Sequence, residues 1–177
     1  MVQEEEIVFQ GEVEPNPSEE NPYLGLRRKV LGLKRQDFVA YMREHAVHAV
    51  LIDTNMDGII YSVALVVDGT ISLYYQTGGG VLGMGQKFQD LAMATRAFVY
   101  SADQVISKLP VAKDTNLPEI GERTFYIIAE DKVYKAVSHK SQMADEPYEI
   151  QILNYLSEKV MAQFISLYEA KDISKTD

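Results

Sequence analysis

The chain has 177 residues, a length that fits one domain together with a tail. It contains no cysteine, which excludes disulfides, iron–sulfur clusters, thiolate zinc sites and cysteine nucleophiles. Its formal net charge of −9 at pH 7 leaves it without the basic surface that nucleic acid requires, so nucleic acid is not an expected partner.

The negative charge is concentrated at the start of the chain. Residues 1–26 contain seven glutamates, three prolines and no lysine or arginine. Such a segment buries too little apolar surface to offset the entropy lost on ordering. We therefore predict a disordered acidic tail over residues 1–26, a single folded domain over 27–172 and a polar tail over 173–177. The sequence has no run of about 18 apolar residues and no signal-peptide pattern at its start, so we expect a cytoplasmic protein without a membrane partner.

The domain is predicted to begin with a basic run and a short helix. Arg27, Arg28 and Lys29 are expected on a solvated face that attracts the acidic tail, with the acidic surface of a partner as the alternative. Apolar residues then recur at helical spacing over residues 34–45, which predicts a first short helix.

Three runs rich in valine, isoleucine and tyrosine follow and are predicted as β-strands. They cover residues 47–53, 59–67 and 70–76. The pairs Asp57-Gly58 and Asp68-Gly69 stand between them and are strong signals for tight hairpin turns, so the three strands should form an antiparallel meander. Both alternating sets of residues in the middle strand are largely apolar, which indicates a strand that is covered on both faces.

The second half of the chain predicts two helices separated by a hairpin. Residues 88–109 carry one apolar face over six turns and predict a long helix that ends at Pro110. A loop and a hairpin over residues 123–129 and 132–138 come next, and a last helix is predicted over about 145–170. Together these elements predict an α+β fold, in which a central antiparallel sheet of about five strands carries helices packed on it.

A glycine-rich stretch, residues 77–86, stands between the third predicted strand and the long helix. It contains five of the eleven glycines, and glycine permits both positive φ angles and close approach of another group to the backbone. Free N–H groups at a helix N-terminus suit phosphate or carboxylate, so one hypothesis is that this stretch binds a nucleotide or another small anion. The ligand-binding residues would be Thr77, Gly78, Gly79, Gly80, Gly83, Gly85 and Gln86. The alternative is structural: a tight strand-to-helix connection, or contact with the backbone of another subunit.

Other chemical motifs are incomplete. The glycines match the dinucleotide-binding spacing Gly-x-Gly-x-x-Gly, but they follow an antiparallel meander instead of the parallel βαβ unit that this motif requires. Asp53, Asn55 and Asp57 match the first half of a calcium loop, yet Ala64 occupies the twelfth position, where such loops carry glutamate. A hairpin turn is therefore the favoured interpretation, with calcium as the alternative. No Gly-x-Ser-x-Gly or Ser-x-x-Lys motif occurs, so no catalytic residue, metal or cofactor is predicted.

The predicted order of elements, over about residues 34–170, resembles the profilin-like group of α+β modules that includes roadblock and longin domains. Those domains have a central five-stranded antiparallel sheet and act mainly as dimerising scaffolds and regulators of GTPases, which implies an interaction role but transfers no site residues. Roadblock domains place two strands before the middle helix and three after it, whereas this chain is predicted to have three and two. The stretch Leu73-Tyr-Tyr-Gln-Thr-Gly-Gly-Gly is also similar to a segment of uncharacterised bacterial proteins, a likeness that implies no activity.

These observations favour a non-enzymatic interaction or regulatory module. It would associate with itself as a homo-oligomer, or with another protein, through a helix or a sheet edge. The alternative is a small-ligand binder that uses the glycine-rich stretch. An enzyme is the least favoured class because no nucleophile with an adjacent base stands out in the sequence.

Overall fold

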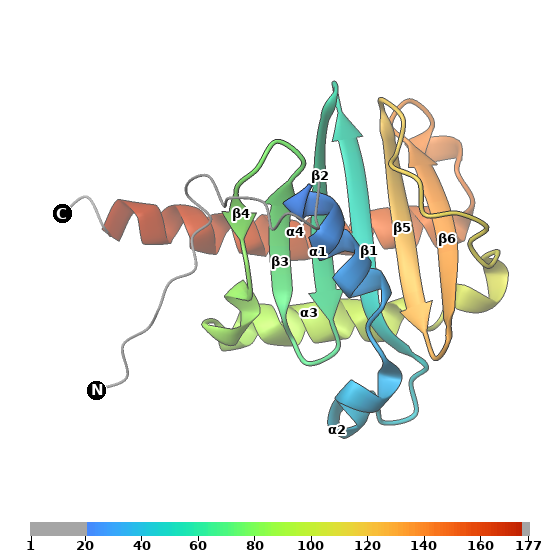
Figure 1. The fold of residues 1–177 in the computed structure, drawn as a ribbon, viewed down its shortest axis with the longest axis horizontal. Helices are drawn as coiled ribbons and strands as arrows, with labels where there is room; N and C mark the ends of the chain where they lie inside the picture. Colours follow the sequence, from blue (N-terminus) through green and yellow to red (C-terminus); the bar gives the residue numbers. More distant parts are fainter. Residues whose placement is uncertain (1–20, 175–177) are drawn as a thin grey trace.

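The computed structural model describes residues 21–174, which form a six-stranded antiparallel sheet with helices on both faces (Figure 1). The strands are β1 (Val47–Met56), β2 (Ile59–Val66), β3 (Ile71–Tyr75), β4 (Gly80–Val81), β5 (Glu122–Ala129) and β6 (Lys132–His139). They lie in the order β4-β3-β2-β1-β5-β6. The α+β class and the antiparallel sheet are therefore confirmed, and the strand that was not predicted is the two-residue β4.

The predicted helices are present with different bounds. The α-helices are α1 (Pro22–Leu31), α2 (Val39–Met42), α3 (Gln89–Ala102) and α4 (Tyr148–Ser174), and short 3₁₀ turns form η1 (Arg35–Phe38), η2 (Met84–Gln86), η3 (Ile106–Lys108) and η4 (Met143–Asp145). The helix predicted over 34–45 is divided into η1 and α2, and it stops where Arg43 adopts a φ of 47°. The helix predicted over 88–109 ends at Ala102. Among the described residues, no helix is long and apolar enough to cross a membrane.

The β1–β2 hairpin closes as its Asp57-Gly58 pair predicts. Both residues have positive φ angles, 54° and 91°, and Met56 pairs with Ile59 across the two-residue loop. Positive φ at both central positions is the geometry whose twist matches that of the two strands. The turn therefore sets the register between β1 and β2.

Both faces of the central strands are buried, as the two apolar sets of the middle strand indicated. On one face, Val50 and Ile52 of β1 belong to the main core, together with residues of α3 and α4. On the opposite face, Leu51 of β1 packs in a second cluster with Tyr23 of α1. Figure 1 shows α1 in front of the sheet and α3 and α4 behind it. Because successive residues of a strand point to opposite faces, the burial of nine consecutive β1 positions requires helices on both sides.

Helix α1 was not predicted, and it begins inside the segment assigned to the acidic tail. Asn21 caps it, since its side-chain oxygen accepts the N–H of Tyr23 at 2.9 Å, and Pro22 occupies the first turn. The low apolar content of the acidic segment as a whole concealed this start. The predicted disorder of the remaining tail concerns residues 1–20, which lie outside the described residues, as do residues 175–177.

Two glycines of the glycine-rich stretch pack against the chain's own backbone. A Cβ atom on Gly85 would lie 2.0 Å from the carbonyl oxygen of Gly69, and a Cβ atom on Gly80 would lie 2.3 Å from the carbonyl oxygen of Leu73. Both distances are far shorter than van der Waals contact. At these two positions, close packing of β4 on β3 and of η2 on the turn between β2 and β3 explains why glycine is required.

The substitution Gly85→Ala is expected to lower the free energy of unfolding by about 3 kcal/mol, because the overlapping atom belongs to backbone that cannot move aside. Gly32→Ala is the matched control. Gly32 has a φ of −92°, and its added Cβ would lie 3.1 Å from the nearest oxygen, so the change should be about 1 kcal/mol or less. Urea denaturation followed by circular dichroism measures both values, and equal losses would contradict the packing argument.

Candidate functional site

The candidate calcium residues lie on β1 and in the turn that follows it. Asp53 and Asn55 are two residues apart on β1 and so point to the same face of the sheet. The Asn55 side chain donates to the carbonyl oxygen of Pro118 and accepts the N–H of Gly58, both at 3.0 Å. Within residues 21–174, no group of three or more histidine, aspartate or glutamate side chains is arranged to hold a metal ion. The Asn55 contacts instead organise the hairpin turn and the loop before β5.

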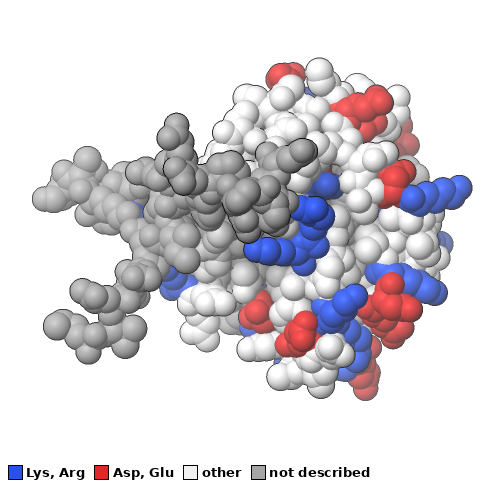
Figure 2. Space-filling model, viewed as in Figure 1, with Lys and Arg blue, Asp and Glu red and all other residues white. Residues whose placement is uncertain are grey.

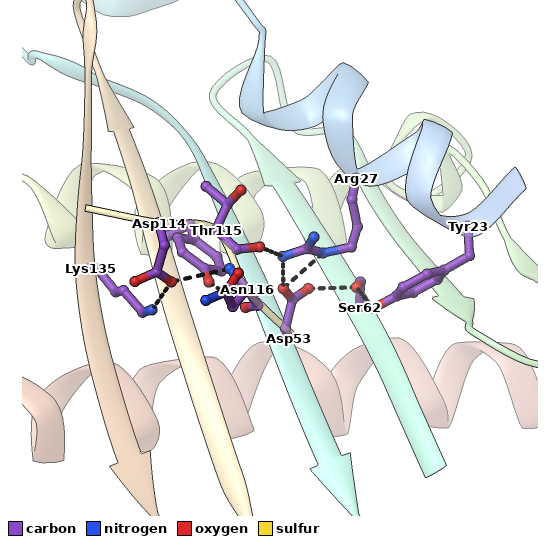
Figure 3. Close-up of polar contacts among 9 residues, drawn as sticks. Tyr23, Arg27, Asp53, Ser62, Asp114, Thr115, Asn116 and Lys135 are labelled. Carbon is purple, nitrogen blue, oxygen red and sulfur yellow. Dashed lines mark hydrogen bonds and ion pairs between the residues drawn. The ribbon is translucent and has the colours of Figure 1, made fainter. Parts of the chain in front are cut away.

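Asp53 is the centre of a polar cluster beneath α1, which Figure 3 shows. The residue is 0% exposed. Its Oδ2 accepts hydrogen bonds from Nε and Nη2 of Arg27 at 2.9 and 2.5 Å, and its Oδ1 accepts one from the Ser62 hydroxyl at 2.6 Å. The hydroxyl oxygens of Tyr23 and Ser62 are 2.8 Å apart. We call these four residues the Asp53 cluster, and they join α1 to β1 and β2.

Arg27 also ties the loop between η3 and β5 to the sheet. Its Nη2 donates to the carbonyl oxygen of Thr115 at 3.0 Å, and its guanidinium lies 5.7 Å from the ring centre of Tyr126. The Tyr126 hydroxyl donates to the carbonyl oxygen of Asn116 at 2.7 Å. The prediction that Arg27 lies on a solvated face is therefore wrong, because the residue is buried and neutralises a buried carboxylate.

Burial controls the protonation of the tyrosines near Asp53. Burial, followed by the negative charge of Asp53, raises the pKa of Tyr23 to about 12. The same two causes raise the pKa of Tyr74 above its usual range. Both phenols are therefore neutral at ordinary pH, and the Asp53 carboxylate is fully engaged by its donors. This arrangement suits a structural fastening better than acid–base chemistry.

A second polar cluster lines a cavity of about 210 Å³ where α4 crosses β5 and β6. We call this cavity the Arg123 pocket. Its lining includes Thr54, Glu122, Arg123, Ser138, Lys140, Asn154 and Glu158. These residues come from β1, β5, α4 and the end of β6, so only the folded chain brings them together.

Arg123 is held in place by three side chains from two other elements. Its Nε donates to Oγ1 of Thr54 at 3.3 Å. Its Nη1 donates to Oδ1 of Asn154 at 3.1 Å and to Oε1 of Glu158 at 3.4 Å. The guanidinium is thus oriented before any ligand arrives, while part of it stays accessible, since 22% of the side chain is exposed.

Hydrogen bonds behind Arg123 fix the orientation of Asn154. The Nδ2 of Asn154 donates to Oγ of Ser138 at 2.7 Å, and that hydroxyl donates to Oε2 of Glu146 at 2.9 Å. The other oxygen of Glu146 accepts the backbone N–H of His139 at 2.6 Å. Because Nδ2 is engaged on this side, the amide oxygen of Asn154 faces Arg123.

An apolar recess of about 100 Å³ adjoins the pocket. Its apolar lining is Ile52, Tyr61, Val63, Met161 and Ile165. Thr54, Arg123 and Glu158 line both spaces, so Arg123 lies at the boundary between a polar cavity and an apolar one.

One side of α4 supplies the helical wall of this whole region. Asn154, Glu158, Met161, Ile165 and Tyr168 follow a spacing of four, three, four and three residues, which places them along one side of the helix. Figure 1 shows α4 running behind the sheet from β6 to beyond β4. The same side of the helix is therefore polar where it meets β5 and β6 and apolar further along.

The predicted ligand-binding glycines lie elsewhere, along the opposite edge of the sheet. Thr77, Gly78 and Gly79 lie in the turn between β3 and β4, whereas Gly83 and Gly85 lie at the other end of β4, near η2. Gly80 starts β4, and Gln86 ends η2, where its Nε2 lies 3.4 Å from Oγ1 of Thr70. Helix α3 begins only at Gln89, three residues after the end of the glycine-rich stretch. The stretch is therefore distributed along the edge of the sheet. Anion binding by its residues stays a prediction.

The Arg123 pocket was not predicted, although the sequence carries one signal for it. Asn154 and Ser157 interrupt the apolar spacing of the last helix, and both are buried. Buried polar side chains need hydrogen-bond partners, so their presence within an apolar pattern indicates a polar cluster. The partners themselves lie in distant segments and cannot be identified from spacing.

No family model, curated protein or solved structure matches this chain. The interpretation of the site therefore rests on its geometry.

Breaking the Arg27–Asp53 pair on one side is expected to be strongly destabilising. Asp53→Asn leaves the buried Arg27 charge without its counter-charge and should lower the free energy of unfolding by about 3–5 kcal/mol. Adding Arg27→Met removes that charge and should recover part of the loss. Urea denaturation of the two single variants and the double variant measures the coupling energy between the two residues. If the double variant lost as much free energy of unfolding as the two single variants together, the residues would not be coupled.

The raised pKa of Tyr23 predicts a specific pH dependence. The pKa is about 12 in the folded protein and about 10 in an unfolded chain. The folded state therefore holds the Tyr23 proton more tightly, and the stability that comes from this proton is complete below pH 10 and is lost as the pH rises towards 12. Tyr23→Phe should cost about 1 kcal/mol at pH 8, through the lost hydrogen bond to Ser62. The cost should be smaller at pH 11. The unaltered protein loses stability there because the Tyr23 phenol ionises in the unfolded chain, whereas the variant has no phenol at this position.

Urea denaturation at both pH values measures this difference. Tyr148→Phe is the control, because Tyr148 is exposed and should change stability little at either pH. A cost of Tyr23→Phe that is the same at pH 8 and pH 11 would rule out the proposed shift.

Proposed function

We propose that the protein is a non-enzymatic interaction module that associates with itself through an apolar surface beside α4. The observation that carries the proposal is a group of large apolar side chains that are between 37% and 55% exposed. They are Met56, Ile59, Tyr75, Ile165 and Tyr168, and we call them the α4 surface.

The members of the α4 surface are neighbours in space. Ile59 and Tyr61 lie on the same face of β2, and Tyr61 pairs with Tyr75 of β3, with ring centres 5.9 Å apart. Ile165 lines the same recess as Tyr61, and Tyr168 follows it after three residues on the same side of α4. Monomeric proteins rarely expose large contiguous apolar patches, and tyrosine and methionine are enriched at interfaces.

The two edges of the sheet are less suited to self-association. At one edge, β4 is two residues long. At the other edge, Val111 bridges Tyr134 of β6, and Glu146 accepts the backbone N–H of His139. Short or covered edges limit pairing with the strand of another chain, so the proposal assigns association to the helix surface.

The shape of the α4 surface suits a second copy of the same chain. Ile165 and Tyr168 are exposed on one side of α4, and Ile165 also lines the recess together with Tyr61 and Met161. In a two-fold dimer each copy presents the same patch, so exposed apolar side chains beside a recess can pack against the same residues of the second copy. Figure 2 shows the opposite face, around α1, where acidic and basic side chains are interspersed among the other described residues.

The test is the mass of the full chain in solution, measured by sedimentation velocity over a range of concentrations. We expect a monomer–dimer equilibrium, and Ile59→Lys and Tyr168→Lys should each weaken it by about tenfold or more, because a buried charge would replace an apolar contact. Met93→Lys is the control, since Met93 of α3 is 56% exposed and lies outside the α4 surface. A monomer at all concentrations, or equal weakening by Met93→Lys, would refute the proposal.

A further inference from the structure

We propose that the Arg123 pocket binds a small apolar carboxylate, with the carboxylate at Arg123 and the apolar part in the adjoining recess. The site borders the α4 surface, because Met56 lines the pocket and Ile165 lines the recess. A second copy seated in the recess would compete with the ligand, but ligand binding does not require self-association.

The first argument is the cost of the polar cluster. Thr54, Ser138 and Asn154 are all buried between the sheet and α4, in a region where apolar side chains would close the fold. Burying polar side chains costs desolvation free energy, which hydrogen-bond partners only offset. A polar cluster at a place where apolar side chains would pack therefore indicates a role beyond packing. Here the hydrogen bonds of the cluster converge on Arg123 and hold it at the wall of a cavity.

The second argument is the donor capacity that remains on Arg123. Its hydrogen bonds use Nε and Nη1, and Nη2 has no hydrogen-bond partner among the described residues. A guanidinium carries five N–H donors in a planar fork and recognises carboxylate oxygens well. The lining holds one further positive charge, Lys140, and three carboxylates, those of Asp57, Glu122 and Glu158. The Glu122 carboxylate accepts the N–H of Glu119 at 3.0 Å, and Arg123 is therefore the group in the lining whose free donors suit a carboxylate.

The third argument is the size and polarity of the two spaces. The pocket measures about 210 Å³ and the recess about 100 Å³. Each is smaller than the cavities of about 300 Å³ or more that hold drug-sized ligands, so the ligand must be a small molecule. The recess is lined by the apolar side chains of Ile52, Val63 and Met161, which suit a branched aliphatic group.

Glu158 determines which carboxylates should bind best. Its Oε1 lies 3.4 Å from Nη1 of Arg123, and its side chain is 57% exposed. A ligand with an ammonium group next to its carboxylate can donate to Glu158 while its carboxylate accepts from Arg123. An apolar α-amino acid would therefore use both charged residues, whereas a plain fatty acid would use Arg123 alone.

The experiment uses the full chain and three probes of similar shape at 10 mM: leucine, isocaproate and isoamylamine, which lacks the carboxylate. Thermal unfolding should shift upward by about 2–4 °C with at least one of the two carboxylates and should not shift with isoamylamine. Glu158→Gln distinguishes the two kinds of carboxylate ligand. It should weaken the binding of leucine, whose ammonium loses its partner, and should not weaken the binding of isocaproate. The Tyr168→Lys variant should keep the shift, which separates this inference from self-association.

Arg123→Gln should abolish the shift. Arg96→Gln is the matched control, because Arg96 is also half-buried and donates two hydrogen bonds at 3.0 Å, but to backbone oxygens of Val67 and Asp68, which do not line the pocket. The absence of a shift with both carboxylates, a shift that persists in Arg123→Gln, or an equal shift with isoamylamine would overturn the inference.

An NMR titration of the unaltered protein covers the case in which Arg123→Gln does not fold. The Nε–H signal of Arg123 and the methyl signal of Met161 should move with the carboxylate concentration. Changes confined to other regions of the protein would overturn the inference in the same way.

Discussion

Burial of both faces of β1 is the constraint on which the rest of this structure depends. Helices α3 and α4 cover one face, and without α1 the opposite face would expose apolar side chains such as Leu51. Asp53 lies in the middle of that second face and needs a counter-charge where water is excluded, and Arg27 of α1 supplies it. The same contact therefore covers the sheet and neutralises its buried carboxylate. Since a buried ion pair often adds little net stability, its main effect here is to define where α1 docks.

The face behind the sheet is covered less completely, and this difference produces the candidate site. Helix α4 crosses behind the strands beside α3, and the ends of β1, β2 and β5 on the side away from α3 extend past it (Figure 1). The space beside the helix becomes the Arg123 pocket at β5 and the apolar recess at β1 and β2. One side of α4 thus serves two surfaces of different chemistry, because its residues change from Asn154 and Glu158 to Ile165 and Tyr168 along its length.

The glycine-rich stretch illustrates how one sequence feature can have several local causes. Gly78 and Gly83 adopt positive φ angles of 101° and 66°, while Gly80 and Gly85 are pressed against other backbone atoms. A turn, an edge strand and a 3₁₀ turn each place a different demand on these residues. Their grouping in the sequence therefore reflects a compact route along the sheet edge from β3 to α3, in agreement with the structural interpretation of the stretch.

The sequence by itself determined the α+β class, the antiparallel strands and the Asp57-Gly58 hairpin, because alternation and turn chemistry depend on residues that are close in the chain. It also located the last helix and much of α3. It could not show α1, whose start lies in an acidic segment, or the partners of Asp53 and Arg123. Arg27 and Asp53 are 26 residues apart, and Arg123 and Asn154 are 31 apart. Only the tertiary structure decided these pairs, because a spacing pattern reports the preference of each segment, whereas a buried polar contact depends on which distant segments the core brings together.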